Sequence, residues 1–265
     1  MTAFRLSANI GYLWKELPFL DRIRRAADNG FDAVEFHDDA QREDRAALKD
    51  VLAEAGLPVL GLNVRMGDSV GCAAIPEASD QAKRDIEAAV EIAEDIGAGA
   101  VHVLAGKAAG KRAHDAYIEA LRFALDNTDL TILIEPVCTE QLPGFFLRTI
   151  EQADQVLAEI DHPSLKIMFD CYHVHRESGS LLAHFRNHAS KIGHVQIASA
   201  EARAEPFPGE LDYRTLLPAF RGAGYSGHFG CEYRPRGTTD EGLSWRRTIS
   251  ELLNTDGPKP YTSVR

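Results

Sequence analysis

The stretch Leu130–Pro136, with the sequence LTILIEP, indicates how this chain folds. Five of its first six side chains are aliphatic or β-branched, which is typical of a short strand buried on both faces. The proline ends the strand because it lacks an N–H group and favours an extended conformation in the residue before it. Glu135 is therefore predicted to stand at the carboxyl end of a central strand.

Three later segments repeat this pattern. Each is a short hydrophobic run that ends in a side chain carrying an oxygen atom, and helix-like segments separate the runs. The segments are 165–170 (LKIMFD), 192–196 (IGHVQ) and 227–232 (GHFGCE), and their last residues are Asp170, Gln196 and Glu232. The repetition predicts that the fold brings these oxygens together.

The whole chain alternates between strand-like and helix-like segments. The other expected strands are Arg5–Asn9, Ala33–Phe36, Val59–Leu62 and Ala100–Leu104. The expected helices are Leu17–Asn29, Asp44–Ala55, Ala78–Ile96, Lys111–Asp126, Thr149–Ile160, Ser180–Ala189, Asp212–Arg221 and Thr239–Leu253. Asp212 and Thr239 are expected to cap the last two helices. Glycines at 30, 56, 97 and 224 are expected to end the helices before them.

Eight such alternations favour an α/β fold, a (β/α)₈ TIM barrel, as a single domain over residues 1–265. The alternative is a doubly wound open sheet. That fold would more often carry a glycine-rich phosphate-binding turn after the first strand, and residues 9–12 do not form one. Residues 254–265 are polar and contain two prolines, so we expect a surface tail there.

Composition and charge limit the classes of function. The formal net charge of −11 argues against a nucleic-acid or membrane partner, which would favour a basic surface. The start of the chain lacks the pattern of a signal peptide, and no apolar run approaches the ~20 residues that span a bilayer. The four cysteines show no C-x-x-C spacing. We therefore expect buried, reduced thiols in a cytoplasmic enzyme.

Carboxylates at neighbouring strand ends point to a metal site. The carboxyl ends of all strands in such a barrel meet at one mouth. Glu135, Asp170 and Glu232 would repel one another there unless a cation neutralised them. With Gln196 they form an all-oxygen set without a thiolate, which suits Mg²⁺ or Mn²⁺ better than Zn²⁺.

Longer motifs carry a resemblance to a known family. The segments are IEPV…LPGFF (134–146), FDCYH (169–173), KIGHVQIA (191–198), R-x-EP-x-x-GE-x-x-Y (203–213) and GCEYRP…EGLSW (230–245). The start of the chain through residue 36 and VHVLAGK (101–107) are similar as well. Together they resemble the hydroxypyruvate isomerase family, within the xylose isomerase-like TIM barrels, over nearly the whole chain.

The resemblance implies an activity and a set of residues. Glu135 and Glu232 would form an acid/base pair, and both would also bind the metal with Asp170 and Gln196. Related sugar 3-epimerases usually carry histidine where Gln196 stands, so the amide oxygen favours Mg²⁺. Two carboxylates can move a proton between neighbouring carbons, as an aldose–ketose isomerisation requires. The expected reaction interconverts hydroxypyruvate and 2-hydroxy-3-oxopropanoate.

A small 2-oxo or hydroxy acid also needs a cation for its own carboxylate. Lys107 and Arg203 match family positions and are the candidates. His173 matches the family's D-x-x-H pattern and is assigned to substrate binding, although a structural role stays open. Glu205 is assigned to orienting Arg203 or to closing the loop over the substrate. His102 and His194 lie inside strands and are expected to be structural histidines of the barrel.

Several segments depart from the family pattern. The loop after the second strand is HDDAQRE (37–43), without the aromatic, proline-containing segment expected there. The loop after the third strand is short and lacks a tryptophan, Phe146 replaces a common histidine, Ser199 replaces an acid, and residues 205–210 are EPFPGE. These departures leave the metal set and the two glutamates intact, so they concern the substrate rather than the type of reaction.

Other functions stay open at this stage. One is an isomerase of a four-carbon 2-oxo acid of the 2-oxo-tetronate type. A sugar 3-epimerase fits Gln196 less well, and an endonuclease of the same superfamily would need more metal-binding histidines and a basic groove. From a different class, the chain could be a non-catalytic barrel that binds sugar acids. A homodimer is the base-rate expectation for such a barrel.

Overall fold

The computed structural model describes residues 4–255 and forms a closed barrel of parallel strands in the order β1 to β8. The strands are β1 (Leu6–Asn9), β2 (Ala33–Phe36), β3 (Val59–Asn63), β4 (Ala100–His102), β5 (Thr131–Ile134), β6 (Leu165–Asp170), β7 (Ile192–Ile197) and β8 (Phe229–Cys231). β8 pairs with β1, so the ring closes without a free sheet edge. The predicted (β/α)₈ barrel is confirmed.

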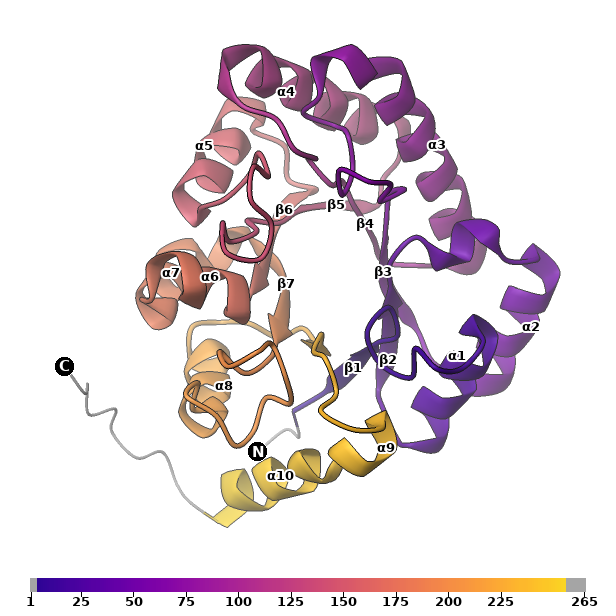
Figure 1. Cartoon of the computed structure of the whole chain (residues 1–265), viewed down its shortest axis with the longest axis vertical. Helices are drawn as coiled ribbons and strands as arrows, with labels where there is room; N and C mark the ends of the chain where they lie inside the picture. The colour runs from indigo at the N-terminus through magenta and orange to yellow at the C-terminus, as the bar shows by residue number, and fades with distance from the viewer. Residues whose placement is uncertain (1–3, 256–265) are drawn as a thin grey trace.

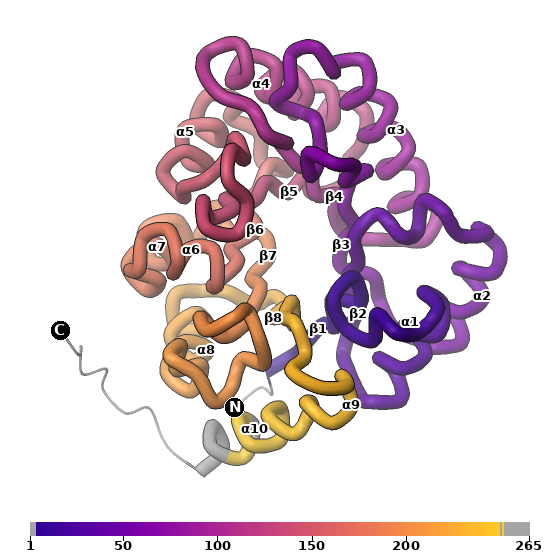
Figure 2. Tube along the Cα trace, viewed as in Figure 1, coloured from indigo at the N-terminus to yellow at the C-terminus, as the bar shows by residue number. Residues whose placement is uncertain are grey.

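Helices surround the strands as an outer ring (Figure 1). They are α1 (Phe19–Asp28), α2 (Arg45–Ala55), α3 (Ser79–Ile96), α4 (Gly110–Asn127), α5 (Ile150–Ile160), α6 (Cys171–Ser178), α7 (Leu181–His188), α8 (Tyr213–Gly222), α9 (Thr239–Gly242) and α10 (Ser244–Thr255). Short 3₁₀ helices cover Asp39–Arg42, Pro76–Ala78 and Ala189–Lys191. Figure 2 follows the chain once around the ring from indigo to yellow, which brings its first and last strands together.

Helix α3 shows why these segments form and how they end. Ile86, Ala89, Val90 and Ala93 recur at intervals of three and four residues and are all buried, so one face of the helix packs on the barrel. The helix ends at Gly97, whose φ of 69° lies in the left-handed region that favours glycine. Both features follow the sequence prediction.

Helix α6 was not predicted. Its sequence, CYHVHRES, lacks a run of apolar residues at helical spacing. The helix begins there because the Asp170 side chain accepts a hydrogen bond from the N–H group of Tyr172 at 2.7 Å. Asp170 thus ends a strand and caps a helix at the same time.

The last predicted helix, Thr239–Leu253, is two helices, α9 and α10. The predicted N-cap was wrong by one residue, because Thr238 forms the capping box with Glu241. The hydroxyl of Thr239 is buried and instead accepts a hydrogen bond from the backbone N–H group of Trp14 at 2.7 Å. Helix α10 continues to Thr255, so residues 254 and 255 belong to it. The rest of the predicted tail, 256–265, lies outside the described residues.

The capping box of Thr238 leads to a stability prediction. Thr238→Ala is expected to lower the free energy of unfolding by about 1 kcal/mol, because the backbone N–H groups at the start of α9 lose their acceptor. Thr238→Ser retains a hydroxyl and serves as the matched control. Urea unfolding of both variants measures the difference, and equal midpoints for the two would refute the capping role.

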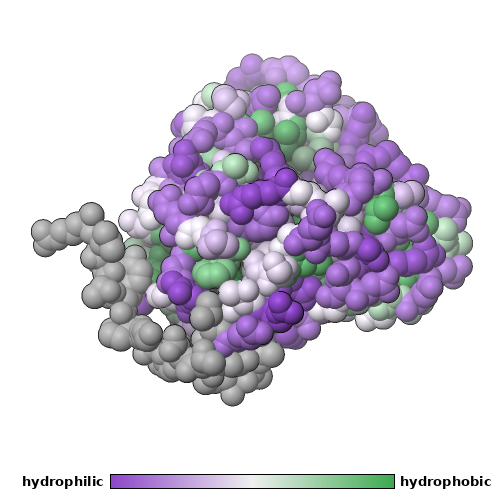
Figure 3. Space-filling view, turned by 60° about the horizontal axis from the view of Figure 1, so that its bottom comes forward, coloured by the Kyte–Doolittle hydropathy of each residue, from purple (hydrophilic) through white to green (hydrophobic). Residues whose placement is uncertain are grey.

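Apolar side chains fill the space between strands and helices, and a separate small cluster of Ala100, Leu133 and Met168 comes from β4, β5 and β6. Hydrophilic residues cover most of the face drawn in Figure 3, with small hydrophobic areas between them. The four cysteines are free, and three of them are buried, in line with the prediction of reduced thiols. Within residues 4–255, no helix has the length and apolar character needed to cross a membrane.

Candidate active site

The four predicted metal ligands lie at the ends of four successive strands. Glu135 directly follows β5, Asp170 ends β6, Gln196 lies in β7 and Glu232 directly follows β8. None of these residues is more than 7% exposed. Parallel strands of a closed barrel all end on the same side, so these four side chains belong to one mouth of the barrel.

The guanidinium group of Arg203 lies between two of the carboxylates. Its Nη2 atom is 2.5 Å from Oδ2 of Asp170 and 2.7 Å from Oε2 of Glu232. Burial alone would raise the pKa of Asp170, but the charge of Arg203, His173 and backbone N–H donors together outweigh it and hold that pKa below its usual value. The pKa of Arg203 itself is raised, because its two carboxylate partners outweigh its own desolvation.

Aromatic rings and an unusual backbone hold Arg203 in this place. Its Cζ atom lies 5.0 Å from the ring centroid of Tyr12 and 5.4 Å from that of Tyr172. Nη1 donates to the Tyr12 hydroxyl at 3.2 Å. Ala202 and Arg203 both adopt positive φ angles, 56° and 53°, which are uncommon for residues other than glycine. The loop between β7 and α8 therefore accepts a strained backbone to deliver this side chain.

Glu135 has a different environment from Glu232. Its Oε1 atom is buried and has no hydrogen-bond partner among residues 4–255. Its nearest ring nitrogens are Nε2 of His173 at 3.8 Å and Nε2 of His102 at 3.9 Å. Burial raises the pKa of Glu135 well above its usual range, and the charges of Glu232 and Asp170 raise it further. The charge of Arg203 opposes these effects without cancelling them, so Glu135 is held toward its neutral form.

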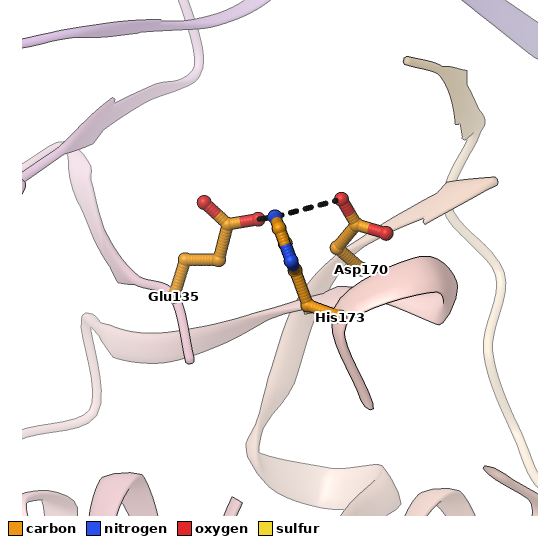
Figure 4. A group of neighbouring side chains, drawn as sticks. All are labelled: Glu135, Asp170 and His173. Carbon is orange, nitrogen blue, oxygen red and sulfur yellow. Dashed lines mark ion pairs between the residues drawn. The ribbon is translucent and has the colours of Figure 1, made fainter. Parts of the chain in front are cut away.

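His173 points its ring between Glu135 and Asp170 (Figure 4). Burial and the charge of Arg203 lower the pKa of this histidine to about 3, so the ring is neutral. Nδ1 accepts a hydrogen bond from the backbone N–H group of Cys138 at 3.4 Å and lies 3.2 Å from the thiol sulfur of Cys138. Because Nδ1 accepts, the ring hydrogen is on Nε2, which lies 3.6 Å from Oδ2 of Asp170. His173 is thus prepared to donate a hydrogen bond into the site.

The donor atoms of the site fit a divalent cation. Ligand atoms of Glu135, Asp170 and His173 lie within 4.8 Å of one another. The Oε1 atoms of Glu135 and Gln196 are buried without a hydrogen-bond partner in the described part of the chain, and such atoms are costly unless something binds them. Hard cations such as Mg²⁺ and Mn²⁺ take oxygen ligands of this kind. His173 fits less well as a ligand, because its Nε2 carries a hydrogen.

Lys107 and Glu205, two predicted substrate-binding residues, make no hydrogen bond or ion pair with the four predicted metal ligands in the described part of the chain. Lys107 is exposed, and its backbone bridges to Phe145. Its ammonium group has no ion pair with any residue between 4 and 255. The carboxylate of Glu205 accepts a hydrogen bond from the backbone N–H group of Arg236 at 2.9 Å. It also forms an ion pair with the guanidinium group of Arg236 at 3.4 Å. Glu205 lines an open pocket of about 440 Å³ with Arg236 and Trp245.

Two residues of the site were missed by the sequence analysis. His37 lies one residue beyond β2, and its Nε2 is 3.3 Å from Oε1 of Glu232. Tyr12, in the loop after β1, contacts both Arg203 and the ring of His37. Their position just beyond strand ends was the available signal, because that is where side chains reach the mouth of a barrel.

Polar side chains fill the barrel below the carboxylates. Glu35 pairs with His194 at 2.5 Å, and Nδ1 of His102 lies 3.2 Å from Oδ1 of Asn63, so both histidines have polar partners inside the barrel. Desolvation opposes the charge on His194, but Glu35 outweighs it and raises the pKa of His194. Gly230 leaves room for this pair, since a Cβ atom there would lie 2.1 Å from Oε1 of Glu35.

The chain is similar to known isomerases along nearly its whole length. It is 37% identical to 2-oxo-tetronate isomerase from Cupriavidus necator, covering 91% of this chain and 96% of that one. It is 36% identical to hydroxypyruvate isomerase from Escherichia coli, covering 91% and 97% of the two chains.

A crystal structure described as an AP endonuclease, family 2, from Brucella melitensis superposes with a TM-score of 0.88. It is 31% identical and is covered to 98%, against 92% of this chain. The sequence profile of the xylose isomerase-like TIM barrels matches residues 23–249. The resemblance to hydroxypyruvate isomerases noted in the sequence motifs is thereby confirmed, and the chain belongs to the family of xylose isomerase-like TIM barrels.

Proposed function

We propose that this protein is a metal-dependent isomerase of small 2-oxo acids that interconverts hydroxypyruvate and 2-hydroxy-3-oxopropanoate. The observation that carries the proposal is the buried set of three carboxylates at the barrel mouth, two of which pair with Arg203. Relatives named as isomerases of hydroxypyruvate and of 2-oxo-tetronate, at 36% and 37% identity, support it.

In the proposed reaction a proton moves between two neighbouring carbons. One glutamate removes a proton from C3 of hydroxypyruvate, and the electron pair forms an enediolate across C2 and C3. The other glutamate, in its acid form, gives a proton to C2, while the hydroxyl proton of O3 passes to O2, which leaves an aldehyde at C3 and a hydroxyl group at C2. Glu135 and Glu232 suit these two roles because they follow different strands and have different charged neighbours.

The other residues of the site bind and orient the substrate in this proposal. Arg203 is the buried cation of the site and is assigned to the substrate carboxylate. Lys107 remains the second candidate, since its ammonium group is exposed. His173 donates from Nε2 to a substrate oxygen. Glu205 supports the loop of Arg203 through its contacts with Arg236.

A divalent cation, with Mg²⁺ preferred and Mn²⁺ the alternative, would be held by Glu135, Asp170, Gln196 and Glu232. When bound, it would act as a Lewis acid that polarises the substrate's carbonyl oxygen and stabilises the negative charge of the enediolate. The unpartnered oxygens of Glu135 and Gln196 support this assignment.

A four-carbon substrate of the 2-oxo-tetronate type is the second candidate. The 37% identity to a 2-oxo-tetronate isomerase favours it, as do the departures in the loop that begins at His37. The endonuclease alternative has a relative at 31% identity in its favour, but a net charge of −11 opposes binding to a polyanion.

Substrate competition separates these candidates. The magnesium-loaded enzyme is expected to convert hydroxypyruvate with a kcat/KM that exceeds the value for 2-oxo-tetronate by roughly tenfold or more, since one extra carbon unit is worth about that much in a fitted site. Proton NMR of the two conversions measures the ratio. A ratio in the opposite direction would keep the chemistry and change the substrate. Binding of both acids without conversion of either would leave a non-catalytic barrel.

A further inference from the structure

The ring of His37 lies at the barrel mouth, packed against Gly11 and Tyr12. Gly11 lies against the ring, because a Cβ atom at Gly11 would be only 2.5 Å from Nδ1 of His37. The ring meets that of Tyr12 edge-on, with 5.3 Å between centroids. The backbone carbonyl of His37 accepts the N–H group of Asn63 at 3.3 Å, which ties the residue to β3. Its side chain is 16% exposed.

Among the described residues 4–255, the polar contact of the His37 ring is with Glu232. Nε2 of His37 donates to Oε1 of Glu232 at 3.3 Å, while Oε2 of the same carboxylate faces Arg203 at 2.7 Å. Among the side chains of residues 4–255, these two groups are the recorded hydrogen-bond donors to Glu232. The carboxylate is therefore held at both oxygens, and its plane is fixed.

Arg203 and His37, the two donors to Glu232, differ in whether they have other partners. Arg203 also pairs with Asp170, and it is the group assigned above to the substrate carboxylate. Whenever Arg203 turns toward a substrate, His37 is left as the side chain that fixes the orientation of Glu232. A carboxylate that exchanges a proton with carbon must be held in a narrow range of positions, because small displacements cost rate.

We propose that His37 is a positioning residue that holds Glu232 in the orientation required for proton transfer, in a space that Gly11 leaves open for it. The inference rests on the proposed function, since it takes Glu232 as one of the two acid/base groups. It adds a residue from the loop in which the chain departs from the family pattern, and this role acts through Glu232 rather than through contact with the reacting carbon.

Three variants test the inference. His37→Leu removes the donor, His37→Gln keeps an N–H donor on a side chain of similar reach, and Gly11→Ala keeps the imidazole but displaces the ring. His114→Leu is the matched control, because His114 pairs with Glu159 at 2.7 Å on the outer helices. We expect kcat to fall by about tenfold to a hundredfold in His37→Leu and Gly11→Ala with KM nearly unchanged, since binding of substrate is not lost. His37→Gln is expected to recover most of the loss, and His114→Leu to behave as the wild type.

A measurement without substrate tests the contact itself. In the folded, ¹⁵N-histidine-labelled protein, the Nε2 resonance of His37 is expected to shift on Glu232→Gln, while that of His114 stays in place. Should His37→Leu fold poorly, the Gly11→Ala and His37→Gln variants decide the question.

The outcomes are separable from those of the proposed function. A wild type that converts no 2-oxo acid defeats the proposed function and, with it, the role of Glu232. An active wild type together with a folded His37→Leu variant whose kcat is unchanged defeats the inference alone. Equal losses in His37→Leu and His37→Gln with a lowered melting temperature in both would assign His37 a purely structural role and also overturn it.

Discussion

Glu135→Gln is expected to lower kcat by about 10²–10⁴-fold while the protein stays folded. Glutamine has nearly the same shape but can neither take up nor release a proton, so the barrel keeps its packing and loses one half of the acid/base pair. The raised pKa of Glu135, caused by burial and by the neighbouring acids, shows that its charged form is disfavoured in this site. A neutral amide there removes that repulsion.

The stability of this variant is part of the same prediction. Because a buried carboxylate beside two others is costly, we expect the melting temperature of Glu135→Gln in EDTA to equal or exceed that of the wild type. Glu87→Gln, on the exposed face of α3, is the control for the loss of one negative charge. Steady-state kinetics and thermal unfolding give both readouts. A folded variant that keeps a tenth or more of the wild-type kcat would remove Glu135 from the acid/base pair.

The second large effect concerns Arg203 in the metal-free protein. Arg203→Gln is expected to lower the free energy of unfolding in EDTA by about 3–5 kcal/mol, because the buried carboxylates of Asp170 and Glu232 lose the cation that pairs with both. Arg24, which is exposed and pairs with Asp21 and Glu54, supplies the control. Arg24→Gln is expected to leave the free energy of unfolding nearly unchanged, because exposed ion pairs contribute little.

Magnesium should reverse much of this loss. If Mg²⁺ binds to the same carboxylates, it replaces the missing positive charge, and saturating Mg²⁺ raises the stability of Arg203→Gln more than that of the wild type. Calorimetry should also show tighter Mg²⁺ binding in the variant, since no guanidinium competes for the oxygens. A variant that is no less stable than Arg24→Gln in EDTA, or that gains nothing from Mg²⁺, would contradict this account.

The sequence was sufficient to predict the barrel because each strand carries its own signal. The run that ends at Glu135 is buried on both faces, and similar runs end at Asp170, Gln196 and Glu232. In a closed parallel barrel, the strand ends fix where those side chains gather, without further information. Asp170 ends β6 and Gln196 lies in the last part of β7, and both positions follow directly from that rule.

Side chains on loops could not be placed in the same way. Arg203 contacts Asp170 from a loop in which Ala202 and Arg203 adopt positive φ angles. No local sequence pattern predicts such a backbone conformation. Glu205 stands two residues later, yet its carboxylate contacts Arg236. Loop conformation depends on contacts between segments far apart in sequence, whereas strand and helix patterns are local.

His37 illustrates a further limit. A single histidine after a strand has no periodic signal, and its contact with Glu232 joins residues almost two hundred positions apart. The N-cap at Thr238 was missed for a simpler reason. Two adjacent threonines offer the same side chain, and only the fold shows that Thr239 bonds to Trp14 instead.

Exchange of solvent deuterium into a 2-oxo acid tests the central claim most directly. The magnesium-loaded protein is incubated with hydroxypyruvate, and separately with 2-oxo-tetronate, in deuterated water and followed by proton NMR. The double variant Glu135→Gln, Glu232→Gln reports exchange that occurs without the enzyme. We predict magnesium-dependent deuterium at the carbon that loses its proton, together with formation of the isomer, and neither in the double variant. The same rate of exchange for wild type and double variant, with no isomer of either acid, would contradict the account.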